Sequence, residues 1–172
     1  DYVCFSIPTG LSQNKQVKAV EIIPGNQGIV HHVVVAIDSA SNNTIVTTQN
    51  CMGPTGDYIY AYAPGSLPLF FPNDTSNSFG IELQANSSIS LGMHYPEGSF
   101  GMLDSTRIRV YFYPQNTVIR EIDTYWLITN WSFILPPNQI TFVSDSFGPI
   151  SQDLSFMSVF PHMYLLGQDL EC

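Results

Sequence analysis

The sequence predicts an all-β protein, an antiparallel β-sandwich of a jelly-roll-like kind. Three observations indicate this fold: short runs of β-branched and aromatic residues, turn signals between them, and no helical periodicity longer than about two turns. The chain has 172 residues, of which 44% are hydrophobic and 11% charged. This composition suits a packed sandwich and lacks the charge density of a disordered chain.

The expected strands follow one another with Pro, Gly and Asn turns between them. They cover residues 16–23, 29–37, 45–48, 58–63, 79–84, 88–94, 107–113, 121–135, 139–143 and 156–164. Residues 107–113 alternate charged and apolar side chains, as a half-exposed strand does. Residues 121–135 are expected to form a strand pair or one long bent strand.

The domain organisation is inferred from composition, because the chain has no internal repeat and no low-complexity linker. A segment of Pro, Gly, Ser and Asp at residues 148–153 is the one candidate boundary. We therefore expect one domain over residues 1–150. Residues 151–172 are expected to be the start of a second domain or a C-terminal extension.

The charge balance argues against several classes of partner. Five Lys and Arg against fourteen Asp and Glu give a net charge of −9, so no basic patch exists to neutralise nucleic-acid phosphates. The same acidity disfavours anionic membranes and favours cations. No apolar run approaches the roughly 18–20 residues of a membrane span. The chain opens with Asp1 rather than Met, so we expect a processed chain or part of a longer one.

Four sequons of the form N-x-[ST] suggest N-glycosylation, and therefore a secreted protein. Their asparagines are Asn42, Asn73, Asn86 and Asn130. Chance alone would give about two or three such sequons in a chain this rich in Asn, Ser and Thr, so each is weak by itself. Three of them lie in turn-like stretches, where a glycan is readily accommodated, whereas Asn130 lies in an aromatic strand.

Three cysteines in an oxidising compartment predict one disulfide and one thiol with a partner elsewhere. We expect Cys4 to pair with Cys51, which would tie the first strand to the rim of the sandwich. Cys172 is then unpaired within the chain, and a second domain or another subunit would provide its partner. The alternative is that all three cysteines remain reduced and buried.

Three of the four histidines are candidate metal ligands: the adjacent pair His31 and His32, and His94 at the end of a strand. Neighbouring side chains in a strand point to opposite faces, so the pair can share one metal only if the strand is irregular near residues 30–33. Otherwise one ring lies in the core and the other in solvent. Three imidazoles suit copper, zinc or nickel, and the lack of a carboxylate favours copper. With no Cys or carboxylate near either motif, a structural zinc site is not expected.

Other catalytic signatures are absent from the sequence. It contains no G-x-S-x-G, no P-loop, no H-E-x-x-H and no EF-hand loop. Asp104 and Asp123 lie near strand ends, where we expect them to cap turns rather than to act as acids. Met93 is expected to fill the core.

Five motifs lie in the same order as in one known enzyme family. They are residues 1–5 (DYVCF), 24–35 (PGNQGIVHHVVV), 60–65 (YAYAPG), 91–96 (LGMHYP) and 160–167 (FPHMYLLG). Together they resemble the copper type II, ascorbate-dependent monooxygenases, the family of peptidylglycine α-hydroxylating monooxygenase and dopamine β-monooxygenase. The similarity runs over nearly the whole chain and is greatest to bacterial-type relatives.

The resemblance implies roles for particular residues. In that family the first domain holds a copper ion that stores and delivers an electron, with ascorbate as the reductant. The positions that match its ligands are His31, His32 and His94. A second copper, which activates O₂, is held by two histidines and by a Met from a second domain. Here those two histidine positions are His162 and Tyr164, and the Met-bearing domain is missing from the sequence, which stops at Cys172.

These departures from the family pattern set the functional expectation. A phenolate is a poor ligand for a site that cycles through Cu(I), so we expect no complete O₂-activating centre, and His162 is a weak metal candidate. The predicted function is the copper-binding, electron-transfer domain of a secreted monooxygenase-like protein that is not catalytic by itself. The alternatives are a non-catalytic secreted glycoprotein or assembly module and a simple copper carrier. The resemblance supports the Cys4–Cys51 pairing only in part, because the neuroendocrine members pair the first-strand Cys with one after the "HY" motif, and residues 101–107 contain none.

Overall fold

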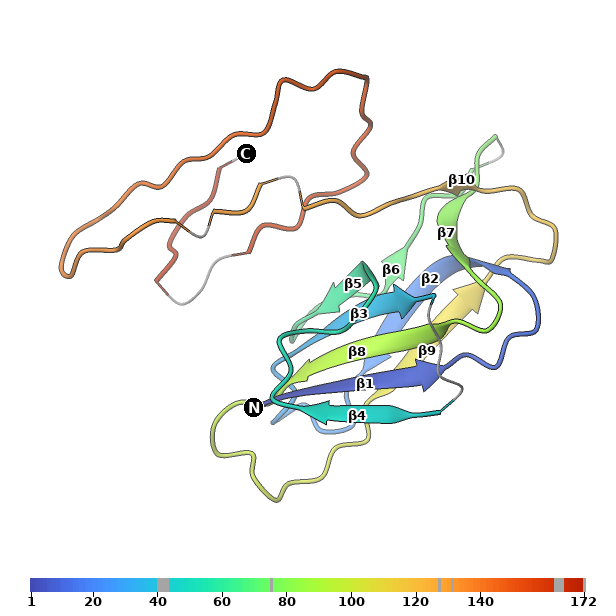
Figure 1. The fold of residues 1–172 in the computed structure, drawn as a ribbon, viewed down its shortest axis with the longest axis horizontal. Helices are drawn as coiled ribbons and strands as arrows, with labels where there is room; N and C mark the ends of the chain where they lie inside the picture. Colours follow the sequence, from blue (N-terminus) through green and yellow to red (C-terminus); the bar gives the residue numbers. More distant parts are fainter. Residues whose placement is uncertain (40–43, 75, 127, 131, 163–165, 172) are drawn as a thin grey trace. The chain divides into compact units, whose positions relative to one another are not determined.

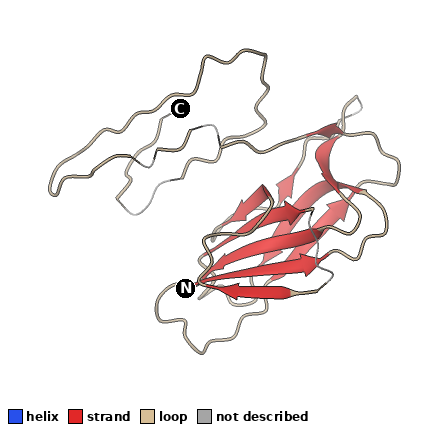
Figure 2. Cartoon of the chain, in the orientation of Figure 1, coloured by secondary structure: helices blue, strands red, loops and turns tan. Residues whose placement is uncertain are grey.

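The computed structural model describes residues 1–171 with the exception of 40–43, 75, 127, 131 and 163–165. The chain divides into two units, Asp1–Thr124 and Tyr125–Cys172, and each is described by itself. The composition boundary at residues 148–153 lies inside the second unit. Figure 2 shows strands and loops, and no helix occurs among the described residues, so the prediction of an all-β fold is confirmed.

The strands all belong to the first unit (Figure 1). They are β1 (Tyr2–Pro8), β2 (Lys15–Ile23), β3 (His32–Asp38), β4 (Val46–Gln49), β5 (Asp57–Tyr62), β6 (Leu69–Phe70), β7 (Phe79–Leu83), β8 (Ser88–His94), β9 (Arg107–Phe112) and β10 (Arg120–Glu121). One sheet has the order β4-β1-β8-β3-β5, with every neighbouring pair antiparallel. The other has the order β10-β7-β2-β6, with β9 also paired to β2, and only its β10–β7 pair is parallel.

The core lies between the two sheets and follows from the alternation of side chains along the strands. From β2 it takes Val17, Val20 and Ile22, and from β3 it takes Val33 and Val35, all of them buried. In β8, the alternate residues Ile89, Leu91 and Met93 join the same cluster. Burial of these side chains removes apolar surface from water and holds the sheets face to face.

The outer face of the first sheet is also covered over part of its length. Ser88 and Ser90 of β8 are fully buried although they point away from the core. The loop that follows β4 covers this face, and Thr55 Oγ1 lies 3.3 Å from Ser90 Oγ. Gly92 is required here, because a Cβ at that position would lie 2.7 Å from Pro54 Cδ.

A disulfide between Cys4 and Cys51 holds the covering loop in place, with a Cα–Cα distance of 6.0 Å. These are the two cysteines that the sequence analysis pairs. Cys4 lies on β1 directly opposite Gly92, so the bond fixes the start of the loop over the middle of the sheet. Cys172 lies outside the described residues.

The second unit differs from the sequence prediction. Strands were expected over residues 121–135, 139–143 and 156–164, but beyond Arg120–Glu121 the described residues of these segments form none, so this prediction was wrong. Every described residue from 125 to 171 is exposed except Asn130, which is half-buried. A strand needs a neighbour to pair its N–H and C=O groups, and these apolar segments find no such partner in the described part of the unit.

Loss of the disulfide should destabilise the first unit. The bond joins residues 47 positions apart, so Cys51→Ser should lower the free energy of unfolding by about 4 kcal/mol on the chain-entropy model. Urea unfolding followed by circular dichroism measures this. Cys172→Ser is the control for loss of a cysteine and should leave the midpoint unchanged. Equal midpoints for wild type and Cys51→Ser would contradict a stabilising role for the bond.

Candidate metal centre

The three predicted histidines lie at one end of the first sheet. His32 is the first residue of β3, and His94 is the last residue of β8. The strand register pairs these two residues directly, and on its other side His94 pairs with Tyr2 of β1. His31 comes immediately before β3. Three segments that are far apart in the sequence therefore meet at this point.

A local irregularity allows the adjacent histidines to converge. The N–H of His31 donates a hydrogen bond of 3.0 Å to the carbonyl of His94, the residue that the register pairs with His32. His31 itself precedes β3, so the chain departs here from the regular ladder that begins at His32. Neither ring enters the core, since His31 is exposed and His32 is half-buried. An irregularity near residues 30–33 is the condition under which the two adjacent histidines can share one metal.

The ring nitrogens of the three histidines form a compact cluster. One nitrogen from each lies within 4.8 Å of the others, and the ring centroids are 4.7 to 5.3 Å apart. His31 Nδ1 is 3.1 Å from His32 Nδ1 and 3.2 Å from His94 Nδ1. Nitrogens at these separations are close enough for His31, His32 and His94 to hold one shared metal ion through bonds of about 2.0–2.1 Å.

Hydrogen bonds between the rings cannot satisfy this arrangement. Nδ1 of a neutral imidazole carries either one proton or one lone pair, so His31 Nδ1 can make a good bond with only one of its two neighbours. A cation between the rings would accept a lone pair from one nitrogen of each histidine. The donor set therefore fits a metal ion bound by three neutral imidazoles.

The electrostatics of His94 favour the form that binds metal. Partial burial and the neighbouring His31 lower the pKa of the His94 imidazole from its ordinary value of 6.5. A lower pKa keeps the ring neutral at physiological pH, and only a neutral ring offers its lone pair to a metal.

Tyr2 is part of the site, and the sequence analysis did not single it out. Its ring stacks on that of His94, with centroids 4.3 Å apart and planes 8° from parallel, and it lies 5.9 Å from the His32 ring. Tyr2 covers one side of His94 and restricts its rotation. The only signal in the sequence is its position two residues before Cys4, on the same face of β1.

The remaining candidate residues lie elsewhere. His162 belongs to the second unit, where its ring stacks on Phe160 with centroids 6.5 Å apart. Tyr164 lies outside the described residues. Asp123 accepts a hydrogen bond from the N–H of the next residue, Thr124. Met93 is buried in the core.

The candidate glycosylation sites are distributed over both units. Asn73 is exposed and forms an isolated β-bridge with Ser78, and Asn86 is exposed in the turn before β8, with a φ of 58°. Asn130 is half-buried, and its side-chain oxygen accepts a hydrogen bond from the N–H of Ser132. Asn42 lies outside the described residues.

Comparison with known proteins returned no match among family models, curated protein sequences or solved structures. Within the described residues, no helix has the length and apolar character required to cross a bilayer.

Removal of any one ligand should weaken metal binding. His31→Ala, His32→Ala and His94→Ala should each lower Cu(II) affinity by roughly one to several orders of magnitude, because each removes one of three nitrogen donors. Competition titration against a chromophoric chelator measures the dissociation constant. His162→Ala is the matched control and should leave this constant unchanged. Full affinity in the His94→Ala variant would refute the three-ligand site.

The stability of the metal-free protein should depend on pH through His94. Its folded-state pKa is lowered, so its contribution to stability is complete above the unfolded value of about 6.5 and is lost as pH falls through the folded value. The free energy of unfolding should thus drop between pH 7.5 and pH 5. The drop should be smaller in His94→Gln, which does not titrate. An identical pH dependence in both proteins would exclude this contribution.

Proposed function

We propose that this chain is the copper-binding, electron-transfer domain of a secreted copper monooxygenase-like protein. The observation that carries the proposal is the convergence of the Nδ1 atoms of His31, His32 and His94. The motifs that contain these three histidines resemble those of the ascorbate-dependent monooxygenases. The geometry and the resemblance are independent arguments, and both select the same residues.

The donor set suits copper and argues against a structural zinc site. The cluster consists of three imidazoles and includes no carboxylate or thiolate from the described residues. Imidazole nitrogen binds both Cu(II) and Cu(I), whereas structural zinc sites usually use four ligands that include Cys. Bound copper would supply one-electron chemistry between these two oxidation states.

The residues around the cluster support an electron-transfer role. Tyr2 and the strand register hold the rings of His94 and His32, so that little rearrangement would accompany a change of oxidation state. His31 is exposed, which leaves one ligand accessible to a reductant such as ascorbate or to a partner domain. The sheet fixes the positions of the ligands, and the exposed ring of His31 is the ligand that a reductant could reach.

Secretion is part of the proposal. The Cys4–Cys51 disulfide suits an oxidising compartment, and the exposed side chains of Asn73 and Asn86 suit a glycoprotein. We propose that this chain does not complete the second copper site of the family it resembles, because Tyr164 occupies the position of one of the two histidine ligands.

Tyr164 also favours a second candidate function. A descendant that has lost the oxygen chemistry could serve as a non-catalytic secreted glycoprotein or assembly module with the same sandwich. In that case the histidine cluster would bind copper weakly, or without a fixed stoichiometry.

One experiment tests the proposal and separates the two candidates. The purified chain, titrated with Cu(II), should show one equivalent of a type II paramagnetic resonance signal, and ascorbate should abolish that signal by reduction to Cu(I). Oxygen consumption coupled to substrate hydroxylation should not occur. The control is the His31→Ala/His94→Ala double variant, which should show only the signal of loosely bound copper. Absence of a stoichiometric signal from wild type would favour the non-catalytic module.

A further inference from the structure

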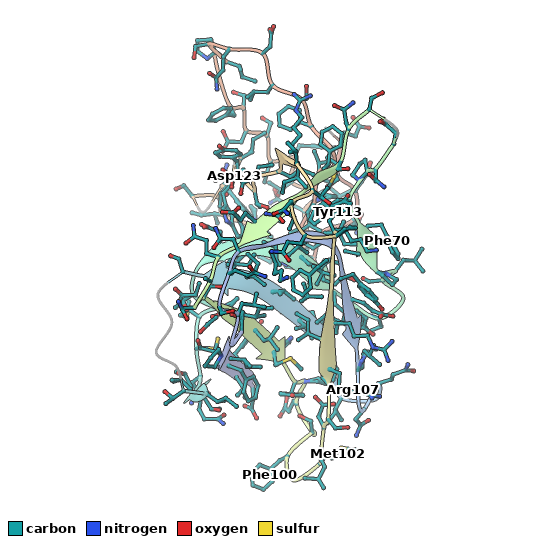
Figure 3. All side chains as sticks on the ribbon, turned by 90° about the vertical axis from the view of Figure 1, so that its right-hand side faces the viewer. Phe70, Phe100, Met102, Arg107, Tyr113 and Asp123 are labelled. Carbon is teal, nitrogen blue, oxygen red and sulfur yellow. A yellow bond between two sulfur atoms is a disulfide. The ribbon has the colours of Figure 1, made fainter. Side chains whose placement is uncertain are left out.

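The carboxylate of Asp104 links two segments that lead to the histidine cluster. Its Oδ1 accepts hydrogen bonds from the backbone N–H of Asn26 and from Thr106 Oγ1, each at 3.0 Å. Its Oδ2 accepts a hydrogen bond of 3.0 Å from the hydroxyl of Tyr95. Asp104 is half-buried and lies in the β8–β9 loop. Figure 3 shows the tip of this loop, with Phe100 and Met102 extending beyond the start of β9 at Arg107.

The bond to Asn26 leads to His31. The carbonyl of Asn26 accepts hydrogen bonds from the N–H groups of Ile29 and Val30, at 3.2 and 3.1 Å, and so closes the turn before the histidine pair. Ile29 and Val30 are both buried, which anchors the end of that turn. A shift of Asn26 would therefore move the backbone immediately before His31.

The bond to Tyr95 leads to His94. Tyr95 directly follows His94, and its hydroxyl reaches Asp104 across the loop. The carboxylate thus bonds to Tyr95 on the side of His94 and to Asn26 on the side of His31.

Further contacts fix the loop against the turn. Asn26 Nδ2 donates to the carbonyl of Leu103 at 3.2 Å, and the N–H of Gly25 donates to Thr106 Oγ1 at 3.3 Å. Gly25 packs so closely on Ser105 that a Cβ would lie 2.4 Å from the Ser105 nitrogen. The turn at Gly25 and Asn26 is therefore in close contact with the β8–β9 loop, and the Asp104 carboxylate bonds to Asn26 across this contact.

We propose that Asp104 is a positioning residue of the metal centre, which sets the separation of His31 and His94 by holding Asn26 and Tyr95. This inference rests on the proposed copper-binding function. The carboxylate acts through the backbone of the two ligand-bearing segments and does not itself bind the metal. Such outer residues commonly change metal affinity by about 10- to 100-fold when they are removed.

The test compares Cu(II) affinity and the paramagnetic resonance spectrum across four variants of the full chain. Asp104→Ala should weaken binding about 10- to 100-fold and alter the copper hyperfine splitting. Asp104→Asn retains an acceptor for Asn26 and should stay within about threefold of wild type. Tyr95→Phe breaks only the link on the side of His94, and should give a smaller loss together with a spectral change. Because this variant keeps the carboxylate, it remains informative even if Asp104→Ala does not fold.

Asp74→Ala is the matched control. Asp74 also carries one negative charge and accepts two turn hydrogen bonds, of 2.7 Å each, from Ser76 and Asn77, but it lies in the β6–β7 connection. Its loss should leave both affinity and spectrum unchanged. Wild-type behaviour in both Asp104→Ala and Tyr95→Phe would overturn the inference and leave the copper site intact. If Asp104→Asn lost as much Cu(II) affinity as Asp104→Ala, or if Asp74→Ala also lost affinity, the effect would be one of charge. Either result would overturn the inference. If wild type binds no copper, the proposed function fails, and this inference fails with it.

Discussion

The pairing of β8 with both β1 and β3 is the constraint on which the metal centre depends. His94 ends β8, and the register places Tyr2 on one side of it and His32 on the other. Side chains of directly paired residues lie about 4.5–5.5 Å apart at Cβ, so three distant parts of the sequence become neighbours without a long loop. A slip of one residue would turn His94 toward the core and would break the cluster. The apolar face formed by Ile89 and Leu91 opposes that slip, because it would have to become exposed.

The sequence predicts the elements of the first unit well wherever alternation and turn signals agree. Residues 88–94 have the same bounds in prediction and structure, because their inward-facing residues are apolar. The expected strand at residues 29–37 begins instead at His32. Ile29 and Val30 are β-branched and buried, yet they lie in a turn closed by the Asn26 carbonyl. A buried turn and a buried strand have the same composition, so hydrophobicity alone cannot separate them.

The site is predictable only in part, for a related reason. The histidines and their suitability for metal are visible in the sequence, but the irregularity that lets His31 and His32 face one way depends on β8, which is distant in the chain. The contributions of Tyr2 and Asp104 depend on partners just as remote, since Asp104 and Asn26 are 78 residues apart. The apolar segments after residue 124 show the same limit. Their composition favours strands, but a strand forms only where a neighbour supplies its hydrogen bonds.

The side chains and the loop that cover the histidine cluster determine from which side another molecule can reach it. Tyr2 stacks on His94, and the loop held by the Cys4–Cys51 disulfide covers the adjoining part of the outer face, next to Gly92. The same loop buries Ser88 and Ser90, so solvent does not reach the middle of β8 from that face. The ring of His31 remains exposed at the end of the sheet. If the cluster holds copper as proposed, an electron donor would meet His31 first. The turn before His31, whose Asn26 N–H bonds to Asp104, would then be the part of the site whose geometry matters most for electron entry.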